Sequence, residues 1–395
     1  MRSSSRPLSG LICLLKAAIF TREYPPEVYG GAGVHVEYLA RELAALIDVE
    51  VRCFGADRQG ALAFRPWAAV KPGGSALETL SVDLAMAADV DAALAHSHTW
   101  YANMAGHVTK LLHAIPHVLT THSLEPSRPW KEEQLGGGGY ALSSWCERTA
   151  IEAADAVIAV STAMREDVLR LYPAVAPERI HVIHNGIDAT EYAPDHGVDV
   201  LEAYGVDPAR PVVLFVGRIT RQKGVTQLLE AALGFDPAAQ LVLCAGAADT
   251  EELLHEVEAG VELLRSRRDG VLWIDQMLLK REVIQLLTHA TVFCVPSVYE
   301  PMGIVNLEAM ACETAVVASR VGGIPDVVVD GDTGYLVDLG EGFPDAFARR
   351  VNELLADPER SRAFGEAGRR RVLDRFTWTA VARTTADLYD ELVRG

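Results

Sequence analysis

Two glutamates and a turn of small residues lie in the segment YEPMGIVNLEAM, residues 299–310, directly after the apolar run TVFCVPS. The run is typical of a buried strand, and Gly303, Ile304 and Val305 predict the start of a helix whose free N–H groups suit an anion. Glu300 would lie at the end of the strand and Glu308 about one turn into the helix, so both carboxylates could face one site. An ionised carboxylate accepts hydrogen bonds from two hydroxyl groups, as sugar binding requires. On spacing alone, however, a loop charge and a surface helix residue explain the pair more simply.

Two cations follow another apolar run, in the segment FVGRITRQKG. The chain carries a formal net charge of −18, so an anionic ligand requires a local positive site. Arg218 offers a planar fork for phosphate oxygens and Lys223 a point charge, just beyond the predicted strand. A solvated basic loop is the alternative, and the position at a strand end favours anion binding.

Glycines open a predicted helix in the segment EVYGGAGVHVEYLA. Gly30 and Gly31 would let the backbone approach a phosphate or a sugar closely, and the helix N-terminus offers N–H groups. The spacing does not match the GxGxxG fingerprint of dinucleotide binding, and a tight turn that simply needs glycine is an equal alternative.

Histidines follow several predicted strands of the first half, at His96, His98, His122 and His184. Each could donate a hydrogen bond to a sugar hydroxyl or an anion, although a hydrogen-bonded packing residue is the simpler interpretation of each one alone. His96 and His98 form a His-x-His pair that could bind a metal. No third ligand stands nearby at a suitable spacing, so we expect no metal site.

Short apolar runs alternate with helical patterns along the whole chain, which predicts parallel α/β sheets. The alternation stops in a segment rich in Gly, Pro and Asp, residues 185–211, and then restarts. We therefore predict two doubly wound domains, residues 1–190 and 191–375. Ligands should lie outside the carboxyl ends of the strands, in the cleft between the domains.

Composition narrows the class of protein. The negative net charge argues against nucleic acid and membrane partners, and no apolar run reaches the roughly 18 residues of a membrane-spanning helix. The six cysteines include no CxxC pair, so we expect reduced thiols and a cytoplasmic location. Residues 1–10 are expected to form a disordered tail. A signal peptide is the alternative, but Lys16 interrupts the apolar run and no small-residue cleavage site follows.

Taken in order, these segments resemble one family. GGAG, HSHTW, THS, NGID, GRITRQKG, YEPMGIVNLEAMA and VGGIPDVV are similar to the motifs of GT4 glycosyltransferases, and the resemblance runs from about Lys16 to the C-terminus. Within the family, TREYPPEVYGGAGVHVEYLARELA and THSLEPSRPWKEEQL are most similar to the glycogen synthase and α-maltose-1-phosphate synthase group. The resemblance implies a GT-B fold of two Rossmann-like domains. It also implies that the C-terminal helix, residues 376–395, packs back on the first domain.

The resemblance also implies roles for the residues singled out above. Glu300 would lie near the donor sugar and Glu308 on the nucleotide ribose, as the two carboxylates of an E-x7-E signature. Arg218 and Lys223 would bind the donor diphosphate, and His122 would lie near the transferred sugar. Other donor contacts are expected at Gly30, Gly31, Gly303, Ile304 and Val305. Acceptor contacts are expected at His98, Arg128 and Lys131, with a solvated loop as the alternative for the two cations.

Several positions depart from the family pattern. Many glycogen synthases carry lysine where this chain has Val28, so that lysine's contacts with acceptor and phosphate are missing here. Thr99 replaces a common aspartate, and Glu313 and Ala315 replace residues of a CGTPVVAS motif. The last two fall at a helix end and on the next strand, where packing is the expected effect.

The implied reaction is the retaining transfer of glucose from ADP-glucose through an α-1,4 bond to glucose 1-phosphate, to the non-reducing end of glycogen, or to both. The cations and the helix N-terminus would stabilise the leaving phosphate, so neither a metal nor another cofactor is expected. ADP rather than UDP follows from the resemblance alone, and the oligomeric state is left open, with a homodimer as one expectation. The alternatives are another GT4 transferase, moving mannose or N-acetylglucosamine to a small or lipid acceptor, an epimerase of the same fold, and a non-catalytic sugar-binding protein.

Overall fold

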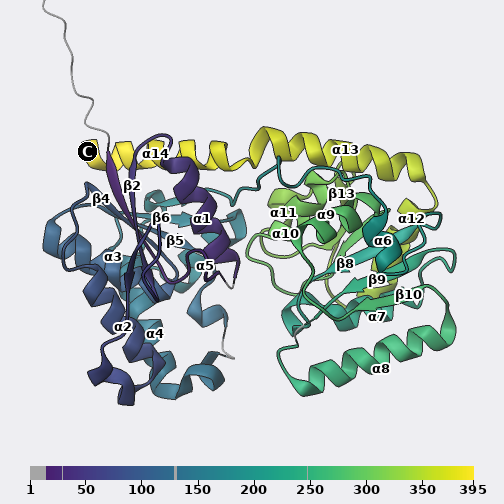
Figure 1. The fold of residues 1–395 in the computed structure, drawn as a ribbon, viewed down its shortest axis with the longest axis horizontal. Helices are drawn as coiled ribbons and strands as arrows, with labels where there is room; N and C mark the ends of the chain where they lie inside the picture. Colours follow the sequence, from purple (N-terminus) through teal and green to yellow (C-terminus); the bar gives the residue numbers. More distant parts are fainter. Residues whose placement is uncertain (1–14, 29, 129–130, 247) are drawn as a thin grey trace, which may run out of the picture. The chain divides into compact units, whose positions relative to one another are not determined.

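The computed structural model describes residues 15–28, 30–128, 131–246 and 248–395, and the expected tail at residues 1–10 lies outside them. Packing divides the chain into two compact units (Figure 1). The first unit ends at Val157 and resumes from Ala382 to Gly395, and the second runs from Ile158 to Val381. The predicted domain boundary after residue 190 and the docking of the whole C-terminal helix stay predictions.

The first sheet has seven strands in the order β3-β2-β1-β4-β5-β6-β7. Every pair whose register is described is parallel. β4 and β5 are buried along their whole length, as expected when helices cover both faces of a parallel sheet. The strands are β1 (Lys16–Thr21), β2 (Asp48–Phe54), β3 (Leu62–Phe64), β4 (Leu94–His98), β5 (His117–Thr121), β6 (Ala156–Ala159) and β7 (Ile180–Val182).

Helices on the two sides of this sheet come from different parts of the sequence. α2, α3 and α4 pack together on one side, where Phe20 of β1 and Met86 of α2 share one apolar core (Figure 1). α1 lies against β1 and β2, and its apolar stripe of Val36, Leu39 and Leu43 is buried. The bounds are α1 (Gly31–Leu43), α2 (Ser75–Met86), α3 (Trp100–His113), α4 (Lys131–Ala153), α14 (Trp378–Arg394), η1 (Ala68–Gly73) and η2 (Glu125–Ser127).

The second sheet has six strands in the order β10-β9-β8-β11-β12-β13, and each neighbouring pair is parallel. Its apolar runs, such as VVLFV and VFCV, are buried because helices cover both faces. The strands are β8 (Val212–Val216), β9 (Gln240–Cys244), β10 (Val271–Ile274), β11 (Val292–Val295), β12 (Val316–Ser319) and β13 (Gly334–Val337).

The helices of the second unit form two layers. α7, α8 and α12 share an apolar core with one face of the sheet. α9 and α13 both pack against α10 in a second layer. Figure 1 shows α7 and α8 on the opposite side of the sheet from α9 and α10. The bounds are α7 (Val225–Ala232), α8 (Glu251–Arg267), α9 (Lys280–His289), α10 (Ile304–Ala311), α12 (Phe343–Leu355) and α13 (Pro358–Arg375). The shorter elements are α5 (Thr162–Leu171), α6 (Asp199–Ala203), α11 (Ile324–Val327), η3 (Pro177–Arg179) and η4 (Arg221–Lys223).

Each sheet has one point where the strand order reverses direction. In the first sheet, β2 lies on one side of β1 and β4 on the other, and in the second sheet β9 and β11 flank β8 in the same way. Loops that leave the carboxyl ends of two such strands diverge, which opens a crevice for a ligand. These two switch points are therefore the places to look for a site. Across the described part of the chain, no helix is both long and apolar enough to cross a membrane.

Candidate active site

The switch point of the second sheet holds Lys223, on the loop that follows β8. The short helix η4 is capped by Thr220, whose Oγ1 accepts a hydrogen bond from the Lys223 N–H at 3.2 Å. Gly224 follows with φ of 66°, and a Cβ atom there would lie 2.0 Å from the carbonyl oxygen of Pro296. Only glycine fits this close approach to the segment after β11, so the backbone around Lys223 has a fixed position.

Lys223 and Glu300 form an ion pair at this switch point. Lys223 Nζ lies 2.7 Å from Glu300 Oε2, and the Glu300 residue is only 7% exposed. The Ser297 hydroxyl donates to the same carboxylate oxygen at 3.4 Å. The sequence predicts both residues as site residues, and the structure brings them together although they lie far apart in the sequence.

A glycine pair after β12 holds the backbone of Glu300. Gly323 N–H donates to the Glu300 carbonyl at 2.9 Å. A Cβ atom on Gly322, whose φ is 52°, would lie 1.9 Å from that same oxygen. The segment VGGIPDVV predicts a constrained loop, and the structure adds its role, which is to position the backbone of Glu300.

Helix α10 begins where the sequence predicts. Gly303 is its N-cap with φ of 87°, and Ile304 and Val305 form its first turn, where both are partly exposed. Glu308 lies on the second turn and accepts a hydrogen bond from the Tyr192 hydroxyl at 3.1 Å. Burial raises the pKa of the Glu308 carboxyl, while the Tyr192 hydrogen bond and the charges of Lys223 and Lys280 act in the opposite direction. The ionised carboxylate has lone pairs for further hydrogen bonds beyond the one from Tyr192.

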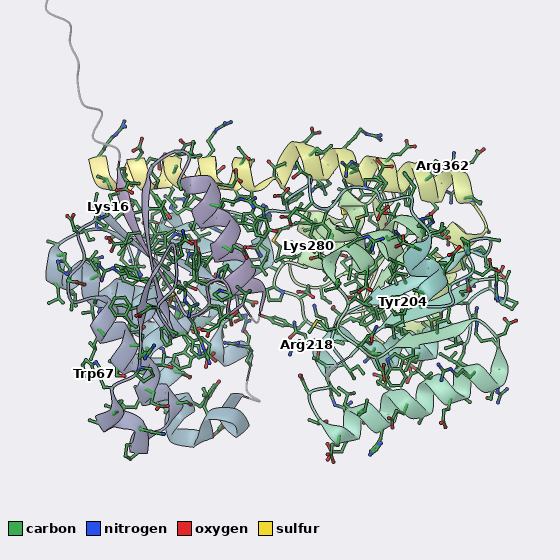
Figure 2. The ribbon with its side chains drawn as sticks, in the orientation of Figure 1. Lys16, Trp67, Tyr204, Arg218, Lys280 and Arg362 are labelled. Atoms are coloured by element: carbon green, nitrogen blue, oxygen red, sulfur yellow. The ribbon has the colours of Figure 1, made fainter. Side chains whose placement is uncertain are left out.

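Arg218 precedes Lys223 on the loop after β8 and has an ion pair of its own. Figure 2 shows its side chain projecting from the loop after β8. Its Nη1 lies 3.6 Å from Asp249 Oδ1, and both side chains are more than half exposed, at 55% each. Such a surface pair is weak, so the guanidinium is available to an incoming anion.

The switch point of the first sheet holds the glycine loop. Gly30 is the N-cap of α1, and its N–H donates to Glu23 Oε2 at 2.8 Å. A Cβ atom on Gly33 would lie 2.7 Å from the same oxygen, and Gly31 is the exposed first residue of the helix. The Glu23 carboxylate therefore already lies at the N-terminus of α1, a feature that no sequence motif indicates.

Three histidines lie at the same switch point. His98 Nδ1 is 3.1 Å from His122 Nε2, and the rings of His35 of α1 and His122 pack in a T-shaped arrangement. Burial, with a contribution from neighbouring histidines, lowers the pKa of His98 and of His122 well below the ordinary value, so both rings are neutral at neutral pH. Sequence spacing indicates no third histidine near the His-x-His pair, and the fold supplies His35 from a separate helix. The sequence pattern that could have identified His35 is a polar residue within the buried apolar stripe of an amphipathic helix.

The remaining predicted residues are more dispersed. Arg128 forms an ion pair with Glu125, which is fully buried and also accepts a hydrogen bond from the Ser143 hydroxyl at 2.7 Å. Lys131 opens helix α4, and its side chain lies outside the described part. His184 Nε2 lies 3.1 Å from Asp326 Oδ2 in the second unit. Arg128 would thus have to share its charge between Glu125 and a ligand.

Comparison with known proteins identifies the family. Residues 29–191 match the model of Glycosyltransferase Family 4, and residues 201–371 match that of Glycosyl transferases group 1. The chain is 56% identical over 383 residues to an α-maltose-1-phosphate synthase of Mycolicibacterium smegmatis, which covers 95% of this chain and 99% of the relative. The chain belongs to the family 4 glycosyltransferases. This glycosyltransferase is also 29% identical to a glycogen synthase of Mycobacterium tuberculosis, over 94% of each chain.

The fold of this glycosyltransferase agrees with solved structures. A sucrose-phosphate synthase from Thermosynechococcus elongatus superposes with a TM-score of 0.77 at 26% identity, covering 96% of this chain and 99% of the other. The predicted family, the GT-B fold class with its two Rossmann-like parallel sheets, and the enzyme class of hexosyltransferase are thereby confirmed. The roles of the individual site residues and the absence of a cofactor stay predictions.

Proposed function

We propose that this glycosyltransferase moves glucose from ADP-glucose to glucose 1-phosphate with retention, producing α-maltose 1-phosphate for α-glucan synthesis. The observation that carries the proposal is the 56% identity to an α-maltose-1-phosphate synthase over nearly the full length of both chains. Extension of glycogen is the second candidate, favoured by the likeness to a glycogen synthase over 94% of each chain.

The charged site after β8 and β11 suits the departure of a nucleotide diphosphate. Negative charge grows on the leaving phosphate, and Arg218, Lys223 and the N-terminus of α10 supply positive potential nearby. Fixed positive groups of this kind do the work that a metal does in other transferases, so we propose transfer without a metal.

Glu300 would orient the donor sugar. The transition state has oxocarbenium character, and a carboxylate favours positive charge on the sugar. Lys223, 2.7 Å from Glu300, would connect the sugar end of the site to its phosphate end, because one ammonium group can bind a carboxylate and a phosphate oxygen together. Glu308, already bonded to Tyr192, would accept hydrogen bonds from the ribose hydroxyls.

The first unit would provide uncharged contacts to the donor and two cations for the acceptor. His122 would exchange a hydrogen bond with a hydroxyl of the transferred sugar, with its tautomer set by the partner nitrogen of His98 3.1 Å away. The backbone of Gly30 and Gly31 would approach the donor, and Arg128 and Lys131 stay the proposed cations for an acceptor phosphate. A cytoplasmic location and a homodimer stay predictions.

Product analysis tests the proposal. The purified protein is incubated with ADP-glucose or UDP-glucose, and with glucose 1-phosphate and glycogen in competition. Maltose 1-phosphate formed from ADP-glucose is the expected main product, and dominant extension of glycogen would instead establish the second candidate. Release of ADP at background level with both acceptors, unchanged in Glu300→Gln, would overturn the glucosyl assignment in favour of transfer of mannose or N-acetylglucosamine.

A further inference from the structure

The histidines at the first switch point have the spacing of a metal ligand set. His35, His98 and His122 each offer one ring nitrogen, and these three atoms lie within 4.8 Å of one another. The ring centroids are 4.7 Å apart for His35 and His122, 5.2 Å for His35 and His98, and 5.4 Å for His98 and His122. Three imidazoles on a tetrahedral zinc, with Zn–N bonds of about 2.0–2.1 Å, also have ring centroids about 5 Å apart.

The Nε2 atom of His98 lacks a hydrogen-bond partner among the described residues. His98 is fully buried, and its Nδ1 faces His122. His96, two residues earlier and equally buried, differs, since its nitrogens lie 2.5 Å from Tyr389 Oη and 2.7 Å from Thr120 Oγ1. If the cluster had only a structural role, we would expect both nitrogens of His98 to have hydrogen-bond partners, as those of His96 do. An unpaired buried nitrogen destabilises the fold.

The access to the cluster also suits a metal. His122 is partly exposed, which gives an ion a path to the cluster.

We propose that His35, His98 and His122 bind Zn²⁺ or a similar divalent transition metal, and that the bound metal inhibits sugar transfer. The inhibition rests on the proposed role of His122, because a metal on its ring would take the lone pair and the space that a sugar hydroxyl needs. Three imidazoles leave a fourth tetrahedral position to water, which suits zinc, whereas Mg²⁺ prefers oxygen ligands. The transfer itself would still need no metal.

Calorimetric titration of the EDTA-treated full-length protein with zinc chloride is the direct test. We expect one zinc ion per chain with a micromolar or lower dissociation constant, and no binding of magnesium chloride. Cobalt(II) should compete with zinc and show the visible absorption of a tetrahedral ion. No zinc binding up to millimolar concentration would overturn the proposal, and this result needs no variant.

Substitution locates the site. His35→Asn removes one ligand but no proposed contact with substrate, so zinc affinity should fall at least about tenfold while transfer without zinc continues. Zinc should inhibit the unmodified enzyme and not this variant. His255→Asn is the matched control, because His255 is an exposed histidine of α8, paired with Glu258, in the other unit. Equal zinc affinity, or equal inhibition, in the His35→Asn variant and the unmodified protein would overturn the site.

The binding measurement separates this inference from the proposed function. Zinc binding is measured without substrate, so a chain that binds zinc through His35 but transfers nothing from ADP-glucose would overturn the proposed function and leave the metal site standing. A chain that transfers glucose but binds no zinc would overturn the metal site and leave the proposed function standing.

Discussion

The two switch points have the same topology and opposite chemistry. After β8 and β11, the site is built from charges, with Lys223 paired to Glu300 at 2.7 Å. After β1 and β4, it is built from glycine backbone, histidine rings that burial keeps neutral and the single carboxylate of Glu23. A diphosphate needs positive charge, whereas sugar hydroxyls need donors and acceptors without net charge. The comparison indicates that the strand order fixes where each crevice lies, while the side chains decide which chemical groups suit that crevice.

Removal of the lysine should have the largest effect. Lys223→Met takes away positive charge from the leaving phosphate, so kcat should fall about 10²–10³-fold. It also leaves the buried Glu300 carboxylate unpaired, which should lower the melting temperature. Arg221→Met is the control, because Arg221 lies in the same short helix but is 67% exposed and pairs with Glu256. Equal losses of kcat in the two variants would show that the loop acts through its general charge alone.

Disturbing the backbone contact between Gly322 and Glu300 should have the second-largest effect on activity. In Gly322→Ala, the new Cβ must move the Glu300 carbonyl, since it would start 1.9 Å away, and a shift of about 1 Å can lower kcat on the order of 10²-fold. Gly331→Ala carries the same kind of backbone strain, with φ of 79°, but its Cβ would meet nothing within 4 Å. Steady-state kinetics and melting curves of both variants would separate displacement of Glu300 from strain. Similar kcat values would contradict the positioning role.

The neutral histidines of the first unit should make it sensitive to acid. Burial lowers the pKa of His117 from 6.5 to about 3, so between these values the unfolded chain binds a proton that the folded chain does not. Stability from this group is complete above pH 6.5 and is lost as the pH falls, by about 1.4 kcal/mol per pH unit. Urea unfolding at pH 7 and pH 5.5 should show a smaller loss for His117→Gln than for the unmodified protein. An equal loss would mean that His117 is not neutral in the folded chain.

Substitution of Glu308 should have the smallest effect. Its contribution to stability should change with pH in the opposite direction to that of His117. The pKa of Glu308 is raised by burial, so the folded chain holds the proton more tightly, and stability falls as the pH rises from 4.5 through the raised pKa. Glu308→Gln should therefore melt at a slightly higher temperature than the unmodified protein at pH 7.5, and the difference should shrink toward pH 4.5. The same variant should bind ADP-glucose more weakly. A difference in melting temperature that does not change with pH would contradict this origin.

The sequence predicts the parts of this structure that depend on local pattern. Apolar runs between helical segments predict the parallel sheets, and the turn at Gly303 predicts the start of α10. It does not predict contacts between distant segments, such as Tyr192 with Glu308 or His35 with His122, because nothing near either residue encodes the partner. Those contacts depend on strand order, which alternation alone leaves undetermined.

The carboxylate of Glu23 at the N-terminus of α1 has a consequence for the design of inhibitors. Because it already accepts the Gly30 N–H at 2.8 Å, this helix end presents negative charge rather than a vacant anion site. A compound with a phosphate or sulfate directed at the glycine loop would meet repulsion, and one with hydroxyl groups there would find an acceptor. We therefore expect compounds that bind at the glycine loop to carry hydroxyl groups there, and anionic compounds to bind instead through Arg218 and Lys223.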